Sequence, residues 1–455
     1  MKKILALLLL LSMLLTLIGC GKPSKSFING ENLENFSIVY SPDDTDYARR
    51  AAEYIKNEIC SRTGLDLPIV KDTEPESQYE IVVGNTSRGI SKRLDAQTEG
   101  LEFAILAEES KIALEGELFI IAAAAYYFID TYVPYDDFSA EIPEAVSVHT
   151  PIVKEAKNYI MLIGDGMGVH QTQIFDYLEN NVEYGDGEDI FYGYYLPYMG
   201  YSRTESLSGV TDSAAGGTAL SCGIKTFNKY IGRDAELNDV KSITELAHEL
   251  GMAAGVRSTE NDTGATPSSF SAHADSRNSS ADIIKSQAEA KQKYGTKIDC
   301  GYDYYTARYM AVIENHITDM LTDLSKDEDG FFLMYEEAHI DKHCHNNDLD
   351  STFNAMVRFN QAIGRFMEYA FYNPDTFILI TADHETGDLY PDENGVLQYH
   401  HDDHTAKNVP VFAYGYGADI FDGVEMENIQ IAHTIASFMG EDNFGDQSVY
   451  QRLNK

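Results

Sequence analysis

The chain has 455 residues, of which 44% are hydrophobic, so it is long enough to bury the cores of one large and one small domain. Its formal net charge of −39 disfavours binding to nucleic acid or to an anionic membrane surface. An anionic substrate would therefore need a local source of positive charge.

The first 20 residues are typical of an export signal. Two lysines precede an apolar run to Ile18, and Gly19 and Cys20 follow. This ending resembles a bacterial lipobox, which implies a lipoprotein signal peptide over residues 1–20 and a lipidated Cys20. A plain signal peptide that contains a cysteine is the alternative. We expect a protein outside the cytoplasm, anchored to the cell membrane through Cys20, with no later membrane span.

Four further cysteines, at positions 60, 222, 300 and 344, lack the spacing of a zinc finger. One incidental disulfide among them stays open. Cys344 lies between His343 and His345, and a buried thiol is favoured over a metal ligand.

Residues 21–30 contain Gly, Pro and Ser without periodicity, which predicts a tether. Residues 31–150 predict a small α/β accessory domain. Its expected elements are strands at 36–40 and 79–84, a helix between them, a hairpin over 101–116 and an apolar helix over 118–133. The domain weakly resembles the accessory domains that precede catalytic domains in some secreted carbohydrate enzymes. It carries no cluster of catalytic residues, so we expect it to space or support the enzyme.

Residues 151–455 predict a larger α/β domain. Short apolar runs without polar alternation suit strands that are buried on both faces, as in a parallel sheet covered by helices. The expected fold is a mostly parallel central sheet with helices on both faces. The runs lie at residues 159–164, 252–258, 331–336, 377–381 and 409–415, and an amphipathic helix over 351–372 joins two of them.

One serine stands where a helix is expected to begin. The sequence GVTDSAAGGTALSCGIKT, residues 209–226, places Ser213 before small residues only. Free N–H groups at a helix start favour an anion, and glycine inside a helix costs about 1 kcal/mol relative to alanine. Gly216 and Gly217 therefore indicate a requirement other than helix propensity. From this stretch alone, an ordinary N-cap is the favoured interpretation of Ser213.

Clusters of carboxylates and histidines follow four of the apolar runs. Ligands of an open α/β sheet gather at the carboxyl ends of its strands, and no single mononuclear site would use so many ligands. The clusters indicate more than one metal ion. They comprise Asp165 in GDGMG, the stretch TENDTGAT, residues 336–345 (EEAHIDKHCH) and Asp383-His384, with HHDDHT at 400–405 before the last run.

These motifs, in this order over roughly residues 157–440, resemble the alkaline phosphatase family. The resemblance implies that Ser213 is the nucleophile that becomes phosphorylated and that Arg277 clamps the phosphate. It assigns Asp341, His345 and His404 to one zinc. Asp165, Asp383 and His384 are assigned to a second zinc, which also binds the oxygen of Ser213.

The resemblance also implies a magnesium ion that Asp165 bridges and that Thr266 and Glu336 complete. Lys342 corresponds to a lysine that contacts phosphate through water in some bacterial members. Gly264 departs from the family pattern, because familiar bacterial members have aspartate and animal members histidine there. This departure falls near the water shell of the expected magnesium ion.

We therefore expect an alkaline phosphatase that hydrolyses small phosphate monoesters through a phosphoserine, with zinc ions activating the serine and the water. One alternative is a phosphodiesterase or phosphonate hydrolase of the same superfamily, which the presence of both Ser213 and Arg277 disfavours. The other is a catalytically dead metal-binding lipoprotein, which has no need of a nucleophile. The oligomeric state stays open between a monomer and a homodimer.

Overall fold

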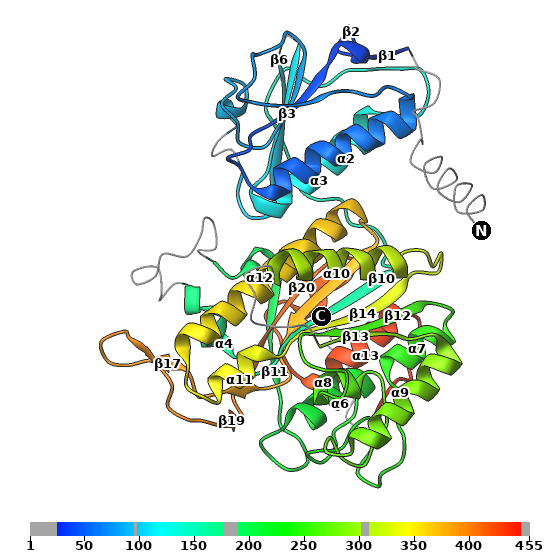
Figure 1. The fold of residues 1–455 in the computed structure, drawn as a ribbon, viewed down its shortest axis with the longest axis vertical. Helices are drawn as coiled ribbons and strands as arrows, with labels where there is room; N and C mark the ends of the chain where they lie inside the picture. Colours follow the sequence, from blue (N-terminus) through cyan, green and yellow to red (C-terminus); the bar gives the residue numbers. More distant parts are fainter. Residues whose placement is uncertain (1–24, 95–97, 109, 176–189, 302–308, 447–455) are drawn as a thin grey trace, which may run out of the picture. The chain divides into compact units, whose positions relative to one another are not determined.

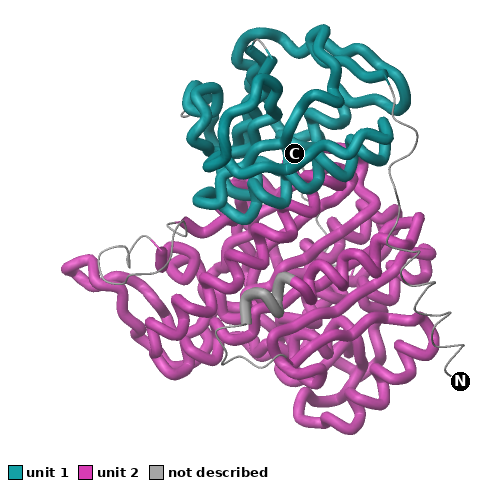
Figure 2. Tube along the Cα trace, turned by 45° about the horizontal axis from the view of Figure 1, so that its top comes forward, with its two compact units in different colours: residues 1–152 teal, residues 153–455 magenta. Residues whose placement is uncertain are grey.

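The computed structural model describes residues 25–94, 98–108, 110–175, 190–301 and 309–446. The chain divides into two compact units, Met1–Ile152 and Val153–Lys455, which Figure 2 draws in teal and magenta. The predicted signal peptide and its lipobox cysteine lie outside the described residues. No helix in the described ranges is both long and apolar enough to cross a membrane.

Unit 1 is built on a six-stranded sheet in the order β4-β3-β5-β7-β6-β9. Its buried strands match the predicted apolar runs, and β6 and β7 form the predicted hairpin. Both predicted helices are present, the second after a short 3-10 turn. The bounds are β3 Ser37–Tyr40, α2 Asp46–Thr63, β4 Ile69–Lys71, β5 Glu80–Val83, β6 Phe103–Glu108, β7 Lys111–Glu115, α3 Ile121–Tyr132 and β9 Ser147–His149.

The tether predicted over residues 21–30 is too long. β1 (Ser26–Ile28) pairs in parallel with β8 (Phe138–Ala140) and antiparallel with β2 (Glu31–Asn32) in a second, three-stranded sheet. The side chains of Ser26 and Ile28 are buried. Local composition suggested a linker because the partner strand lies over a hundred residues further along the chain.

Unit 2 contains an eight-stranded sheet in the order β13-β12-β14-β10-β15-β20-β11-β21 (Figure 1). The five predicted runs form β10, β12, β14, β15 and β20, and the first four pair in parallel. The fifth run, β20, pairs antiparallel with β15 and β11. The bounds are β10 Asn158–Gly164, β11 Tyr198–Arg203, β12 Ala253–Ser258, β13 Lys297–Cys300, β14 Phe331–Glu337, β15 Thr376–Thr381, β20 Val409–Tyr414 and β21 Glu425–Glu427.

Helices cover both faces of this sheet, as the apolar runs predict. Alternate side chains of β10 face opposite ways, so that Met161 joins a core with residues of α6, α7 and α13. On the other face, Tyr335 of β14 packs on Phe359 and Phe366 of α12 (Leu349–Tyr372). The other helices include α6 Ser213–Cys222, α7 Ile243–Glu249, α8 Ala265–Ser269, α9 Ser280–Tyr294, α10 Tyr309–Leu324, α11 His339–Cys344 and α13 Asn428–Phe438.

The topology sets the position of the predicted ligands. β10 lies between β14 and β15, so the segments that follow these parallel strands start at one edge of the sheet. Asp165 comes directly after β10, and Asp383 follows β15 by two positions. The sheet thus brings together side chains that are more than two hundred positions apart in the sequence.

Candidate active site

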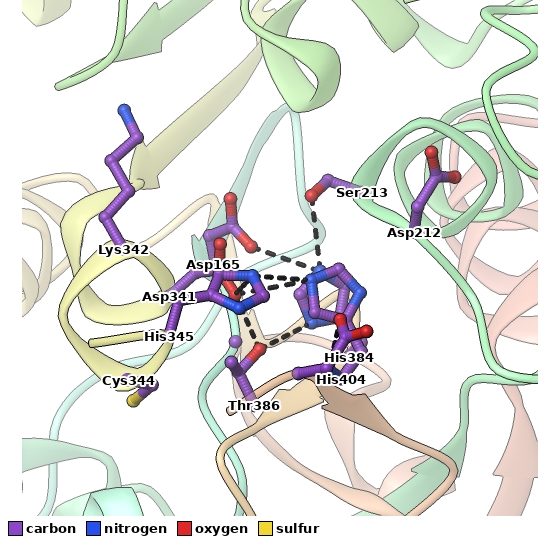
Figure 3. Close-up of polar contacts among 12 residues, drawn as sticks. Asp165, Asp212, Ser213, Asp341, Lys342, Cys344, His345, His384, Thr386 and His404 are labelled. Atoms are coloured by element: carbon purple, nitrogen blue, oxygen red, sulfur yellow. Dashed lines mark hydrogen bonds and ion pairs between the residues drawn. The ribbon is translucent and has the colours of Figure 1, made fainter. Parts of the chain in front are cut away.

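Ser213 is the first residue of α6, and its side chain is buried. Asp212 is the N-cap, and its carboxylate accepts a hydrogen bond from the backbone N–H of Ala215 (3.0 Å). The Ser213 Oγ lies 3.2 Å from the Nε2 of His384, and Figure 3 shows it directed toward the histidines. The serine is therefore held at a helix start beside a predicted metal ligand.

Asp341, His345 and His404 form the first ligand cluster. The Nε2 atoms of the two histidines are 3.1 Å apart, and they lie 3.4 Å and 3.5 Å from the Oδ1 of Asp341. Asp341 and His345 are one helical turn apart at α11, whereas His404 comes from the short strand β19 (His404–Thr405).

Asp165, Asp383 and His384 form the second cluster, and all three are buried. The Nε2 of His384 lies 3.3 Å from the Oδ1 of Asp165 and 3.4 Å from the Oδ2 of Asp383. The ring of His384 stacks on that of His404 with centroids 3.6 Å apart, so the two clusters adjoin (Figure 3).

Hydrogen bonds on the far side of each imidazole fix its orientation. The Nδ1 of His345 lies 2.8 Å from the carbonyl oxygen of Asp402, and the Nδ1 of His404 lies 2.8 Å from that of Thr211. A carbonyl can only accept, so each Nδ1 carries the proton and each Nε2 is free to ligate. The Thr386 hydroxyl donates to Asp341 (2.6 Å) and lies 3.2 Å from the Nδ1 of His384.

The donor atoms of each cluster lie within 4.8 Å of one another, which fits a single divalent cation per cluster. The Oδ1 of Asp165 and the Oδ2 of Asp383 are buried and accept no hydrogen bond from the described residues. Buried carboxylate oxygens without a partner are costly, and a cation would satisfy them. The mixture of carboxylates and imidazoles suits zinc.

The pKa values of the carboxylates reflect this crowding. Burial raises the pKa of Asp165 well above its ordinary value, and the charges of neighbouring carboxylates, led by Asp383, raise it further. Burial and then Asp341 raise the pKa of Asp383 to about 7. Burial would also raise the pKa of Asp341, but the three histidines outweigh it and hold that pKa below its ordinary value. Without cations, the site keeps protons that its ligands must release to bind metal.

The pKa values of two histidines in the site shift in opposite directions. Burial lowers the pKa of His384 well below its ordinary value, and the charge of His404 lowers it further. Burial would lower the pKa of His404 as well, but the hydrogen bond and charge of Asp341 raise it to about 9. His384 is thus the neutral imidazole beside the serine.

Glu336 and Thr266, the residues predicted to complete a magnesium site, are both buried. Glu336 lies at the end of β14, where the Ser258 hydroxyl donates to its Oε2. Burial and then the charge of Glu260 raise the pKa of Glu336 to about 8. Oxygen ligands of this kind suit magnesium. Sequence reasoning did not single out Glu260.

Arg277 and Lys342 each form an ion pair with a carboxylate near the site. The Nη1 of Arg277 lies 3.4 Å from the Oδ2 of Asp212, the cap of α6, so the guanidinium stands beside the serine helix. The Nζ of Lys342 lies 2.8 Å from the Oε1 of Glu260, and Figure 3 shows this side chain extending away from the histidines. Both side chains are one-third to two-fifths exposed.

Three cysteines of the described residues are free thiols. Cys344 is a buried free thiol within 3.4 Å of the Tyr399 hydroxyl, and it points away from the histidines, as favoured from the sequence (Figure 3). Cys222 and Cys300 are also free. The sequence analysis missed Thr386, although its place two residues after His384 offered a signal.

The comparisons with known proteins agree with this geometry. A family model described as alkaline phosphatase matches residues 156–310 and 302–396. Alkaline phosphatase 3 of Bacillus subtilis is 30% identical over 328 residues, which cover 60% of this chain and 70% of that protein. The Escherichia coli alkaline phosphatase is 41% identical over 127 residues, 27% of each chain. The structure of alkaline phosphatase from the Antarctic bacterium TAB5 matches with a TM-score of 0.54 and 29% identity, over 63% of this chain and 99% of that one.

A helix-covered, mostly parallel sheet with two adjoining carboxylate and imidazole clusters defines a metal-binding hydrolase of phosphate esters. The chain belongs to the alkaline phosphatase family, and it is an alkaline phosphatase in activity. The resemblance, the fold class and the type of enzyme predicted from the sequence are confirmed.

Proposed function

We propose that this enzyme hydrolyses phosphate monoesters through a phosphoserine at Ser213, with two zinc ions and one magnesium ion as cofactors. The 3.2 Å separation between the Ser213 Oγ and the His384 Nε2 is the observation that supports it most directly. His384 belongs to one ligand cluster and stacks on the other, so a cation held there would lie beside the serine oxygen.

In this proposal Asp341, His345 and His404 hold one zinc, and the cluster of Asp165, Asp383 and His384 holds the other. When bound, the cations supply positive charge that lowers the pKa of the serine hydroxyl and of an attacking water. The Ser213 oxygen forms a bond to phosphorus, and the ester oxygen departs. Water then cleaves the phosphoserine, releases phosphate and restores the hydroxyl.

The chain itself orients the phosphate. Free N–H groups at the start of α6 face an anion bonded to Ser213, and Asp212 holds the Arg277 guanidinium beside that helix. A guanidinium has a planar fork that binds two oxygens of a phosphate monoester at once. The net charge of −39 would repel such an anion from most of the surface, so this local arrangement carries the recognition.

The magnesium ion would be held by Asp165, Thr266 and Glu336. Burial of all three side chains and the oxygen-only donor set support it. A variant of the TAB5 enzyme that carries glutamate in place of a histidine has Mg bound in its M3 site, and that enzyme is 27% identical to this chain.

Ser213→Ala tests the nucleophile. We expect this variant to lose the phosphoenzyme that is trapped at low pH, together with most turnover, while two zinc ions per chain remain bound. Ser221→Ala, in the same helix but bonded to the Thr218 carbonyl oxygen (3.4 Å), is the matched control and should label normally. Undiminished phosphoserine in Ser213→Ala would show that another residue is the nucleophile.

A further inference from the structure

Gly264 precedes α8 at the position where the family pattern has aspartate or histidine. Its backbone has φ −55° and ψ 151°, which any L-residue adopts, so no strain requires glycine. The space beside Gly264 is occupied instead. A Cβ placed on Gly264 would lie 2.8 Å from both Cγ and Cδ of Glu260 and nearer still to its Oε2. The Glu260 side chain therefore fills the volume that a side chain at position 264 would occupy.

Glu260 is held there by the strand ends. β12 and β14 pair with Ser258 opposite Glu336. The Ser258 hydroxyl donates to the Glu336 carboxylate and accepts a hydrogen bond from the backbone N–H of Glu260 (2.9 Å). The Ser258 hydroxyl thus links the backbone of Glu260 to Glu336, a residue of the proposed magnesium site.

The Glu260 carboxylate also meets Lys342. Its Oε1 lies 2.8 Å from the Nζ, and this is an ion pair between partly buried groups. Carboxylates of Asp165, Glu336 and Glu260 together with the ammonium of Lys342 balance the charge of one divalent cation. Without Glu260, the lysine would leave that site short of negative charge.

We propose that Glu260 supplies, from four positions earlier in the chain, the carboxylate that position 264 lacks, so that it stabilises the third cation and positions Lys342. The inference rests on the proposed magnesium site. Glu260 acts as a positioning residue, because its contacts described above are with Ser258 and Lys342. Gly264 leaves open the volume in which the Glu260 side chain lies.

Magnesium binding by zinc-saturated protein tests the proposal, with calorimetric titration of magnesium alone and metal analysis of each sample. Glu260→Ala should weaken magnesium binding about 10- to 100-fold, the usual effect of removing a supporting group around a metal. Asp262→Ala removes an exposed carboxylate from the same loop and is the matched control, with affinity near that of the unchanged protein. The decisive sample is Glu260→Ala combined with Gly264→Asp, which should regain magnesium affinity to within a few-fold of the original.

Unchanged magnesium affinity in Glu260→Ala would overturn the proposal. A loss in Glu260→Ala that the added aspartate does not repair would overturn the claim that the two positions share one role. Gly264→Asp alone should weaken binding, because the new side chain must displace Glu260. The proposed function predicts two zinc ions per chain in every variant. The zinc content of the same samples therefore distinguishes a failure of the proposed function from a failure of the role given to Glu260.

Discussion

At the scale of single residues, Asp212 links two tasks. Its carboxylate caps α6 by accepting a hydrogen bond from the backbone N–H of Ala215, and it accepts another from the backbone N–H of Lys229 (3.0 Å). The same carboxylate lies 3.4 Å from the Arg277 guanidinium. A carboxylate with two structural bonds is itself held in place, so it can fix the position of a long, partly exposed arginine. If Arg277 binds the phosphate as proposed, Asp212 orients its guanidinium before substrate arrives.

Arg277→Ala should lower kcat/KM for an aryl phosphate monoester about 30- to 150-fold, or about 2 to 3 kcal/mol, the range for hydrogen bonds to charged groups. In a diester, one of the phosphate oxygens carries a second substituent, so the phosphate cannot occupy both positions of the guanidinium fork. The kcat/KM for the diester, which we expect to be lower, should therefore barely change in Arg277→Ala. Parallel steady-state kinetics on the two esters measure the ratio. Equal losses on both would contradict the role given to Arg277, and a preference of the unchanged enzyme for the diester would contradict the monoester assignment.

At the scale of elements, the glycines of α6 are explained by close packing. A Cβ on Gly216 would lie 2.9 Å from the carbonyl oxygen and 3.1 Å from the Cβ of Asp383. A Cβ on Gly217 would instead lie 3.1 Å from the side chain of Ser269 on α8. The serine helix therefore approaches a metal-ligand segment more closely than any larger residue would allow.

Gly216→Ala gains about 1 kcal/mol of helix propensity, yet it should weaken zinc binding about 10- to 100-fold, because it displaces Asp383. Competition with a chromogenic chelator measures the zinc affinity. Gly217→Ala gains the same propensity but faces Ser269, so it serves as the control and should keep its zinc affinity. Tight zinc binding in Gly216→Ala would show that the close approach has no functional consequence.

The sequence predicted the elements whose signal is local. Continuous apolar runs identified five of the eight strands in the large sheet of unit 2, and residues directly after the parallel ones proved to lie at one edge of the sheet. The strands β11, β13 and β21 were missed, because short or half-buried strands depend on partners elsewhere in the chain. Glu260 escaped for a related reason. A carboxylate that stands in for a side chain four positions further along leaves no sequence motif. It is recognised only because the Glu260 side chain occupies the volume beside Gly264.

At the scale of the molecule, cations should change how stability depends on pH. In the metal-free protein the pKa of Asp383 is raised to about 7, that of Glu336 to about 8 and that of His404 to about 9. All three exceed the ordinary values of roughly 3.9, 4.3 and 6.5, so the folded chain keeps protons that the unfolded chain has released. Their stabilising contribution is present at low pH and is lost as pH rises through the raised values. The lowered pKa of His384 affects the pH dependence of stability only below about pH 6.5.

The unfolding temperature of chelated protein should therefore fall between about pH 6.5 and pH 9. Zinc should remove this fall, because bound cations keep the carboxylates ionised and the imidazoles neutral. Calorimetry with chelator and with excess zinc, across this pH range, measures the difference between the two forms. Parallel curves for the two forms, or full phosphatase activity in chelated protein, would contradict the metal assignment.

We also propose attachment to the membrane through Cys20. Cys20→Ser should abolish lipid labelling, and it should release the protein in soluble form or leave its precursor uncleaved. Metabolic labelling with a fatty acid and fractionation of the cells measure both effects. A correctly processed variant that still sediments with the membrane would contradict the lipobox interpretation.

The ligand clusters draw on residues from position 165 to position 404, and the parallel strands of the sheet must pair before these residues meet. A nascent chain that has not yet reached His404 lacks part of one cluster, and an unfolded chain has neither. Loading with metal therefore takes place wherever the sheet is completed. The ions present where the sheet is completed therefore decide which cations the enzyme carries.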